Sequence, residues 1–106
     1  MAWIILVAAG LLEIVWAAAM KQSDGFTRLA PSLVTLVAMI ASVVLLSLSM
    51  RTLPLGTAYT IWTGIGAVGS FVVGIAVLGE AATPLRITAA ALIVAGLVLM
   101  KLSGES

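Results

Sequence analysis

The chain has 106 residues, of which 63% are hydrophobic and 8% are charged, whereas roughly a quarter of the residues in ordinary globular domains are charged. Because a soluble domain of this length would have too few polar side chains to cover its surface, we predict a single integral membrane domain over residues 1–106. The net charge of +1 gives no indication of a nucleic-acid partner, and the lack of cysteine and histidine excludes disulfides and the usual zinc sites, so no metal or cofactor is expected.

Four apolar runs are separated by short polar breaks, and each is near the ~20 residues that a helix needs to cross a bilayer core. The predicted fold class is all-α integral membrane, with four transmembrane helices over about 2–20, 30–50, 55–78 and 84–102. Since the breaks are short, consecutive helices should be antiparallel neighbours. A cleaved signal peptide is the alternative for the first run, but that run lacks a basic start and carries an acid in its apolar core.

The first run contains Glu13, which is the one carboxylate deep within an apolar segment. An acid at the centre of a membrane helix costs about 2.5–3.5 kcal/mol on insertion scales, and such residues usually face a bundle interior or an aqueous cavity and mark ion or substrate paths. A carboxyl group that holds either a proton or a cation is what an exchanger needs. The alternative is a protonated Glu13 that only donates a hydrogen bond to a neighbouring helix.

The helical neighbours of Glu13 are small or aromatic. Gly10 lies three residues before it and Trp16 three residues after it, so all three share one face of the helix. A small residue allows another helix to approach and leaves room beside the acid. Trp16 offers an indole N–H to a carboxylate or a π-face to a cation. Its alternative role is a lipid-facing or interfacial anchor, but anchors belong near helix ends, where Trp3 lies.

The second run has a polar stripe at seven-residue spacing, formed by Thr35, Ser42 and Ser49. A seven-residue repeat keeps its members on one helix face. Ser42 is the member at mid-depth, comparable to Glu13. Two roles fit the spacing equally: a hydroxyl that bridges a carboxylate and a ligand, or a hydroxyl bonded to the carbonyl four residues earlier in its own helix.

The third run, "GTAYTIWTGIGAVGSFVVG", places Tyr59, Trp62, Thr63 and Gly66 on one predicted face. Tyr59 offers a phenol and Trp62 an indole, and both groups can donate hydrogen bonds. Its dense glycines favour close helix packing, and a bend in the helix is the further hypothesis.

The fourth run, "PLRITAAALIVAGLVLMKL", has no charge deep within it. Ala89 and Gly96 are seven residues apart and form a small-residue seam that suits helix association. We interpret this helix as a packing or dimerisation helix without chemistry of its own.

The basic residues are shared almost equally between the two predicted membrane faces. Four spans put Arg51 and Lys101 on one side and Lys21, Arg28 and Arg86 on the other. Such a small difference gives almost no orientation bias under the positive-inside rule. The chain is therefore expected either to adopt one orientation despite its short loops, or to insert in both orientations and pair as an antiparallel dimer.

Three segments resemble the small multidrug resistance transporters: "LLEIVWAAAMK", "GFTRLAPS" and "GTAYTIWTGIGAVG". The tripeptide Trp62-Thr63-Gly64 resembles the guanidinium-exporter subtype, and the resemblance covers the entire chain. Thr60 is a departure, because alanine or valine is more usual there, and it puts fine selectivity in question.

The resemblance implies a proton-coupled antiporter of the bacterial inner membrane that works as an antiparallel homodimer with dual topology. It implies that Glu13 binds both substrate and protons. The residues that support this glutamate by resemblance are Gly10, Trp16, Ser42, Tyr59 and Trp62.

The expected function is export of guanidinium and small guanidinyl cations, with the lipid bilayer and a second copy of the chain as further partners. The alternative is export of hydrophobic quaternary ammonium drugs, which donate no N–H bonds and need wide aromatic walls, whereas this chain has only six per cent aromatic residues. A rotor subunit usually has two helices, and an enzyme is not expected because histidine, cysteine and a paired acid are lacking.

Overall fold

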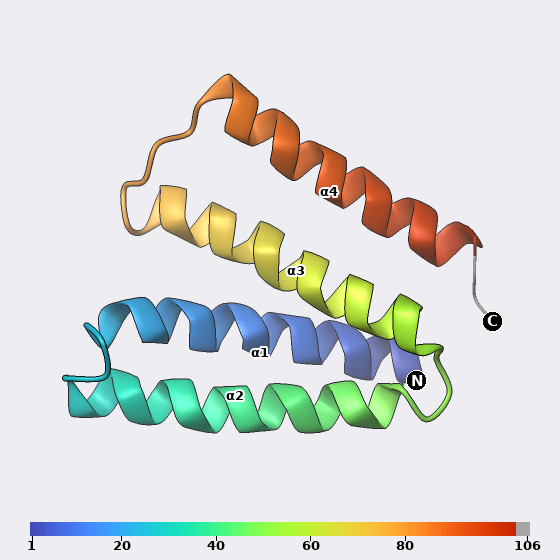
Figure 1. The fold of residues 1–106 in the computed structure, drawn as a ribbon, viewed down its shortest axis with the longest axis horizontal. Helices are drawn as coiled ribbons and strands as arrows, with labels where there is room; N and C mark the ends of the chain where they lie inside the picture. The colour runs from blue at the N-terminus through green and yellow to red at the C-terminus, as the bar shows by residue number, and fades with distance from the viewer. Residues whose placement is uncertain (104–106) are drawn as a thin grey trace.

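The computed structural model describes residues 1–103 and contains four helices in this part of the chain (Figure 1). The helices are α1 (Ala2–Gln22), α2 (Leu29–Ser49), α3 (Leu55–Ala76) and α4 (Pro84–Ser103). Each is long and apolar enough to cross a membrane. The observed ends lie within two residues of those expected from the apolar runs. Residues 104–106 of the predicted domain lie outside the described part.

The connections between helices have local causes. In the first turn, Ser23 is fully buried, and its hydroxyl donates to the Met20 carbonyl at 2.7 Å and accepts from the Phe26 amide at 3.1 Å. Pro54 precedes α3 in an extended conformation, which suits a residue that cannot donate to a preceding turn. After α3 the chain turns at Gly79, whose φ of +70° is in the left-handed region that glycine adopts without strain.

The four helices form a flat assembly, with principal extents of 42 × 34 × 16 Å. Consecutive helices run in opposite directions, so α1 and α3 run the same way (Figure 1). The predicted neighbours α1 and α2 pack extensively, but α3 packs along α1 and contacts α2 only slightly. The expectation that every consecutive pair would be neighbours is therefore wrong for α2 and α3, because glycines on α3 allow α1 to approach it closely.

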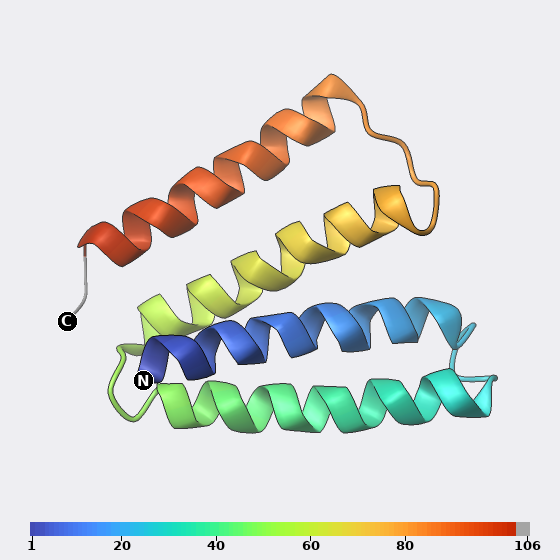
Figure 2. The ribbon, with the colours of Figure 1, turned by 180° about the vertical axis from the view of Figure 1, so that it is seen from behind.

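The α4 helix is held at the edge of the assembly. Among the described residues its backbone comes close to that of α3 alone, and the view from behind also shows α3 between α4 and the other two helices (Figure 2). None of its residues is buried. The core lies instead near the start of α1 and α3, around Leu6, Ala9, Leu46, Leu53, Ala58 and Ile61. Large apolar side chains cover the outer surface, as expected where lipid replaces water.

Candidate functional site

Glu13 lies on the face of α1 that packs against α3. Its side chain rests on Gly66, and a Cβ atom built on this glycine would overlap Glu13 Oε1. This oxygen is buried and has no hydrogen-bond partner among the described residues. A buried polar atom without a partner is rare in folded proteins and is commonly explained by a water, an ion or a ligand that occupies the site. Glu13 is therefore placed to accept hydrogen bonds from a bound group.

Close packing of α1 on α3 positions this carboxylate. Ile65 of α3 fills the space beside Gly10, so that a Cβ on Gly10 would lie 2.6 Å from Ile65 Cγ2. One turn further along, Ile14 of α1 covers Gly69 of α3, where a Cβ would overlap the isoleucine side chain. We call this line of contacts the α1–α3 seam. These contacts fix the depth and direction of Glu13, although Oε1 accepts no hydrogen bond from residues 1–103.

Trp16 follows Glu13 by one turn on α1. Its indole Nε1 is buried and donates no hydrogen bond within residues 1–103. The interior position of this nitrogen argues against a purely lipid-facing role, since interfacial tryptophans keep the N–H at the wet boundary. The structure does not join Trp16 Nε1 to Glu13 by a hydrogen bond. An unpaired donor and an unpaired acceptor therefore lie one turn apart on the same helix.

Ser42 links three helices. Its hydroxyl donates to the Ala9 carbonyl of α1 at 2.7 Å and accepts from Trp62 Nε1 of α3 at 2.9 Å. The other two members of the polar stripe are also fully buried, but Thr35 and Ser49 donate to carbonyls of their own helix. The hydroxyl of Ser42 therefore does not bond to its own helix, which was one of the two predicted roles. Its role as a bridge between a carboxylate and a ligand stays a prediction. Ser42 joins α2 to α3 through Trp62 and to α1 through Ala9, one helical turn before Glu13.

Tyr59 lies at the other side of Trp62. The two rings are 5.6 Å apart between centroids and tilted by 44°, which is a favourable aromatic arrangement. Tyr59 also lines a groove of about 480 Å³ between α3 and α4, together with Thr60 and Thr63. The predicted single face of α3 is therefore divided: Trp62 and Gly66 point toward α1 and α2, whereas Tyr59 and Thr63 border α4.

The sequence alone did not identify Gly66 and the Ala9 carbonyl as parts of this site. Gly66 was grouped with the aromatic residues, and its contact with Glu13 depends on which helix lies beside α3. The spacing contained this signal. Two small residues on α3, Gly66 and Gly69, pack against two larger residues on α1, Glu13 and Ile14. A backbone carbonyl gives no signal in a sequence.

Known proteins similar to this chain are bacterial exporters. It is 58% identical over 105 residues to the guanidinium exporter of Salmonella typhimurium strain LT2, covering 99% of this chain and 100% of that protein. It is 58% identical over 103 residues to the guanidinium exporter of Citrobacter freundii, covering 97% and 98% respectively. The guanidinium exporter of Escherichia coli strain K12 is 57% identical over 103 residues, with the same coverage.

The family described as Small Multidrug Resistance protein matches residues 1–100. This match covers all three segments on which the resemblance was based, so the predicted family is confirmed. The protein is a multi-pass protein of the bacterial inner membrane, because it has four helices that can span a membrane and its relatives are bacterial exporters. The chain belongs to the Small Multidrug Resistance family of transporters.

Proposed function

We propose that this protein is a proton-coupled antiporter that exports guanidinium and small guanidinyl cations, with Glu13 binding substrate and protons in turn. The observation that carries the proposal is the buried, unpaired Glu13 Oε1 in the α1–α3 seam. A membrane carboxylate is costly to keep and is normally functional. The relatives that are guanidinium exporters at 57–58% identity support the choice of substrate.

The chemistry of guanidinium suits such an oxygen. The ion is flat, positively charged and rich in N–H donors, and it has no acceptor. A carboxylate accepts two parallel N–H bonds from a guanidinium group, as it does from arginine. A proton on the same carboxyl removes the negative charge and one acceptor, so a proton and a guanidinium ion compete for Glu13.

The neighbouring residues would orient the carboxylate and the substrate. Trp16 offers its buried indole N–H to Glu13 or its ring face to the cation. Ser42 and Trp62 are already paired and would hold the wall of the site in place. Tyr59 stacks against Trp62 and would close the aromatic side. Gly10 stays small because Ile65 occupies the space beside it.

The working unit in this proposal is an antiparallel homodimer with dual topology. One copy is only 16 Å thick along its shortest axis and has no buried residue on α4, so it encloses too little volume for a polar chamber. Basic residues divide three to two between the faces, which favours insertion in both orientations. Two Glu13 side chains would then face one chamber and titrate as a coupled pair.

Transport follows if the dimer changes the side to which it opens only when the Glu13 pair is occupied. Protons entering from one side would then be exchanged for guanidinium leaving from the other. No covalent step is needed, and the protein acts as a transporter and not as an enzyme, in keeping with its exporter relatives.

The direct test is the substitution Glu13→Gln in purified protein reconstituted into liposomes. It keeps the shape of the side chain and removes both the charge and the proton site. We expect loss of proton-driven guanidinium uptake and of guanidinium binding at Glu13. The matched control is Asp24→Asn, which neutralises an exposed carboxylate in the connection between α1 and α2 and should transport normally. Uptake that persists in Glu13→Gln would refute the proposal.

The pH dependence gives a second test. Because protons compete with guanidinium for Glu13, the apparent affinity for guanidinium should fall as pH falls and rise as pH rises. Solid-supported membrane recordings across a pH series would measure this, with guanidinium, methylguanidinium and a tetraalkylammonium ion as substrates. A larger current with the tetraalkylammonium ion would favour the quaternary ammonium alternative. An affinity that does not change with pH would contradict proton competition.

A further inference from the structure

The α1–α3 seam continues beyond Glu13 to one membrane face. Ala17 and Lys21 follow Glu13 at intervals of four residues on α1, and Ser70 and Gly74 follow Gly66 at the same intervals on α3. Because the two helices run the same way, these residues stay opposite one another. Where the seam ends it opens into a pocket of about 200 Å³. The pocket is lined by Ala17, Ala18, Lys21, Ser70, Val73, Gly74, Leu78 and Glu80.

The turn after α3 directs Glu80 into this pocket. Gly79 adopts a left-handed conformation, and the Glu80 amide then donates to the Gly74 carbonyl at 2.9 Å. The Glu80 carboxylate folds back over Gly74, so that a Cβ built on this glycine would overlap Glu80 Oε1. Glycine at position 74 therefore makes room for a carboxylate, as Gly66 does for Glu13. The two acids lie along one seam, each resting on a glycine of α3.

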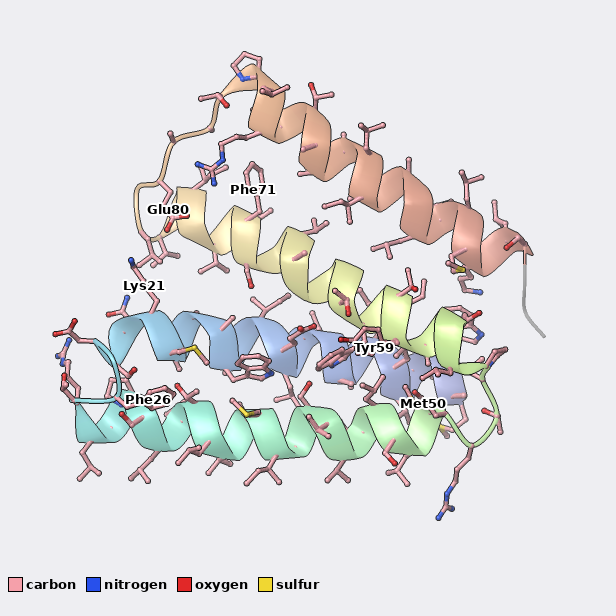
Figure 3. All side chains as sticks on the ribbon, viewed as in Figure 1. Lys21, Phe26, Met50, Tyr59, Phe71 and Glu80 are labelled. Atoms are coloured by element: carbon pink, nitrogen blue, oxygen red, sulfur yellow. The ribbon has the colours of Figure 1, made fainter. Side chains whose placement is uncertain are left out.

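Two charged side chains of opposite sign line this pocket, and Glu80 is the one that would attract a cation. The C-terminal ends of α1 and α3 lie at this face and favour a cation, whereas the N-terminal ends of α2 and α4, which also lie there, have the opposite polarity. Glu80 adds a full negative charge, and Lys21 points toward it across the gap between α1 and α3 (Figure 3). The other charged residues at this face, Asp24, Arg28 and Arg86, are not part of the pocket lining, and Arg86 stacks on Phe71 at 5.3 Å.

We propose that this pocket is an outer binding site for a small planar cation of the guanidinium class, which it holds before or after that cation occupies Glu13. This inference rests on the function proposed above. Glu80 would accept N–H bonds from the ion, and the Ser70 hydroxyl would accept another. Lys21 lies eight residues beyond Glu13 and hence about 12 Å along the helix axis, so the pocket lies at the membrane end of the seam that holds Glu13.

Lys21 weakens guanidinium binding in this proposal, whereas Glu80 strengthens it. Its ammonium is a tethered cation at the mouth of the seam, and it competes with guanidinium for Glu80. The two charged residues should therefore change the apparent affinity for guanidinium in opposite directions. A merely structural role for the pair, in which each stabilises the other, would make both substitutions harmful.

The test measures the guanidinium concentration that gives half-maximal transport in proteoliposomes at low ionic strength. Glu80→Gln should raise this concentration about fivefold, the equivalent of one unit-charge contact at about 4 Å in bulk water, and should leave the maximal rate unchanged. Lys21→Gln should lower it. Both shifts should shrink at high salt, because exposed charges are screened. Asp24→Asn, at the same face but outside the pocket, is the matched control.

A binding measurement separates this site from the proposed function. In the Glu13→Gln protein, guanidinium should still shift the amide NMR signals of Ser70 and Gly74, and the added substitution Glu80→Gln should abolish these shifts. If wild-type protein does not transport guanidinium, the proposed function fails, but this titration still decides the outer site. The outer site is refuted if the Ser70 and Gly74 signals do not respond, or if Glu80→Gln and Lys21→Gln change transport affinity in the same direction.

Discussion

The α3 helix has two dissimilar sides. Toward α1 it presents Gly66 and Gly69, and side chains of α1 fill the space beside each glycine completely. Toward α4 it borders a groove of about 480 Å³, which Thr60 and Thr63 help to line. The closed side holds Glu13, whereas the described residues that line the groove on the open side are all uncharged.

This difference shows how one glycine-rich helix can serve two purposes. On the closed side, glycines let a neighbouring helix press a carboxylate into a fixed position. On the open side, Gly64 takes up Leu97 of α4, but Gly96 of α4 meets no atom within 4 Å of a built Cβ. At Gly96, the small-residue seam predicted on α4 is therefore not filled by another residue of the described part of this chain. It remains available to a second copy in the proposed dimer.

The largest effect is expected from Gly66→Ala, which disrupts the close packing on the closed side of α3. A methyl group at this position would overlap the Glu13 carboxylate, so α1 and α3 must separate or the carboxylate must turn away. Overpacking of this kind usually costs about 1–3 kcal/mol. We expect guanidinium flux in proteoliposomes to fall by about tenfold or more, while the protein still inserts into the membrane.

Gly56→Ala is the matched control for this substitution. Gly56 lies in the first turn of the same helix, and nothing lies within 4 Å of a Cβ built there. Alanine also favours the helix more than glycine does. Its flux should match that of the unsubstituted protein. If Gly66→Ala transported as well as Gly56→Ala, the close contact between Gly66 and Glu13 would not matter for function.

A smaller effect is expected from Ser42→Ala, which tests the hydrogen bonds that join the three packed helices. The substitution leaves Trp62 Nε1 without its acceptor. Hydrogen bonds between membrane helices contribute about 0.6 kcal/mol on average, and an unpaired buried donor costs more. We expect a loss of about 1 kcal/mol in the free energy of unfolding, measured by denaturation in mixed micelles, and a change in tryptophan fluorescence.

Ser49→Ala provides the comparison within the same helix. Ser49 is as fully buried as Ser42, but its hydroxyl donates to the Leu46 carbonyl of its own helix. Its loss leaves no partner on another helix unpaired, so we expect a change below about 0.5 kcal/mol. Equal destabilisation by the two substitutions would mean that the links from Ser42 to Ala9 and Trp62 add nothing to stability.

Some features of the fold and the site could be predicted from the sequence, and others could not. The membrane class, the helix positions and the isolation of Glu13 follow from composition and spacing, because lipid imposes helices of a set length. The partner of Ser42 did not follow, since spacing defines a face of α2 but not the helix that covers it. For the same reason Tyr59 and Thr63 were grouped with Trp62, although α4 borders them and α1 and α2 border Trp62.

The position of α3 beside α1 was the missing information. Short loops indicate that consecutive helices lie near each other, but they allow α3 to contact either α1 or α2. The choice depends on how well the small residues of α3 match the side chains of each candidate, and two glycines opposite Glu13 and Ile14 favour α1. Such matching is visible once the helices are placed together and is not apparent from either helix alone.

The smallest predicted effect concerns the open side, where a cation rests on an aromatic ring near each end of α4. Lys101 Nζ lies 4.7 Å from the centroid of the Trp3 ring on α1, and the Arg86 guanidinium lies 5.3 Å from that of Phe71 on α3. The Lys101 contact joins α4 to α1. The backbones of these two helices do not approach each other in the described chain.

Cation–π contacts contribute about 0.5–1 kcal/mol at exposed sites. A double-mutant cycle of Lys101→Met and Trp3→Leu should therefore give a coupling of that size in the free energy of unfolding. Spin labels on the ends of α1 and α4 should also report a broader distance distribution in Lys101→Met. Arg86→Met should leave this distribution unchanged, because Arg86 lies at the opposite end of α4. If Lys101→Met did not broaden the distribution, the packing of α4 against α3 would by itself hold that end of the helix near α1.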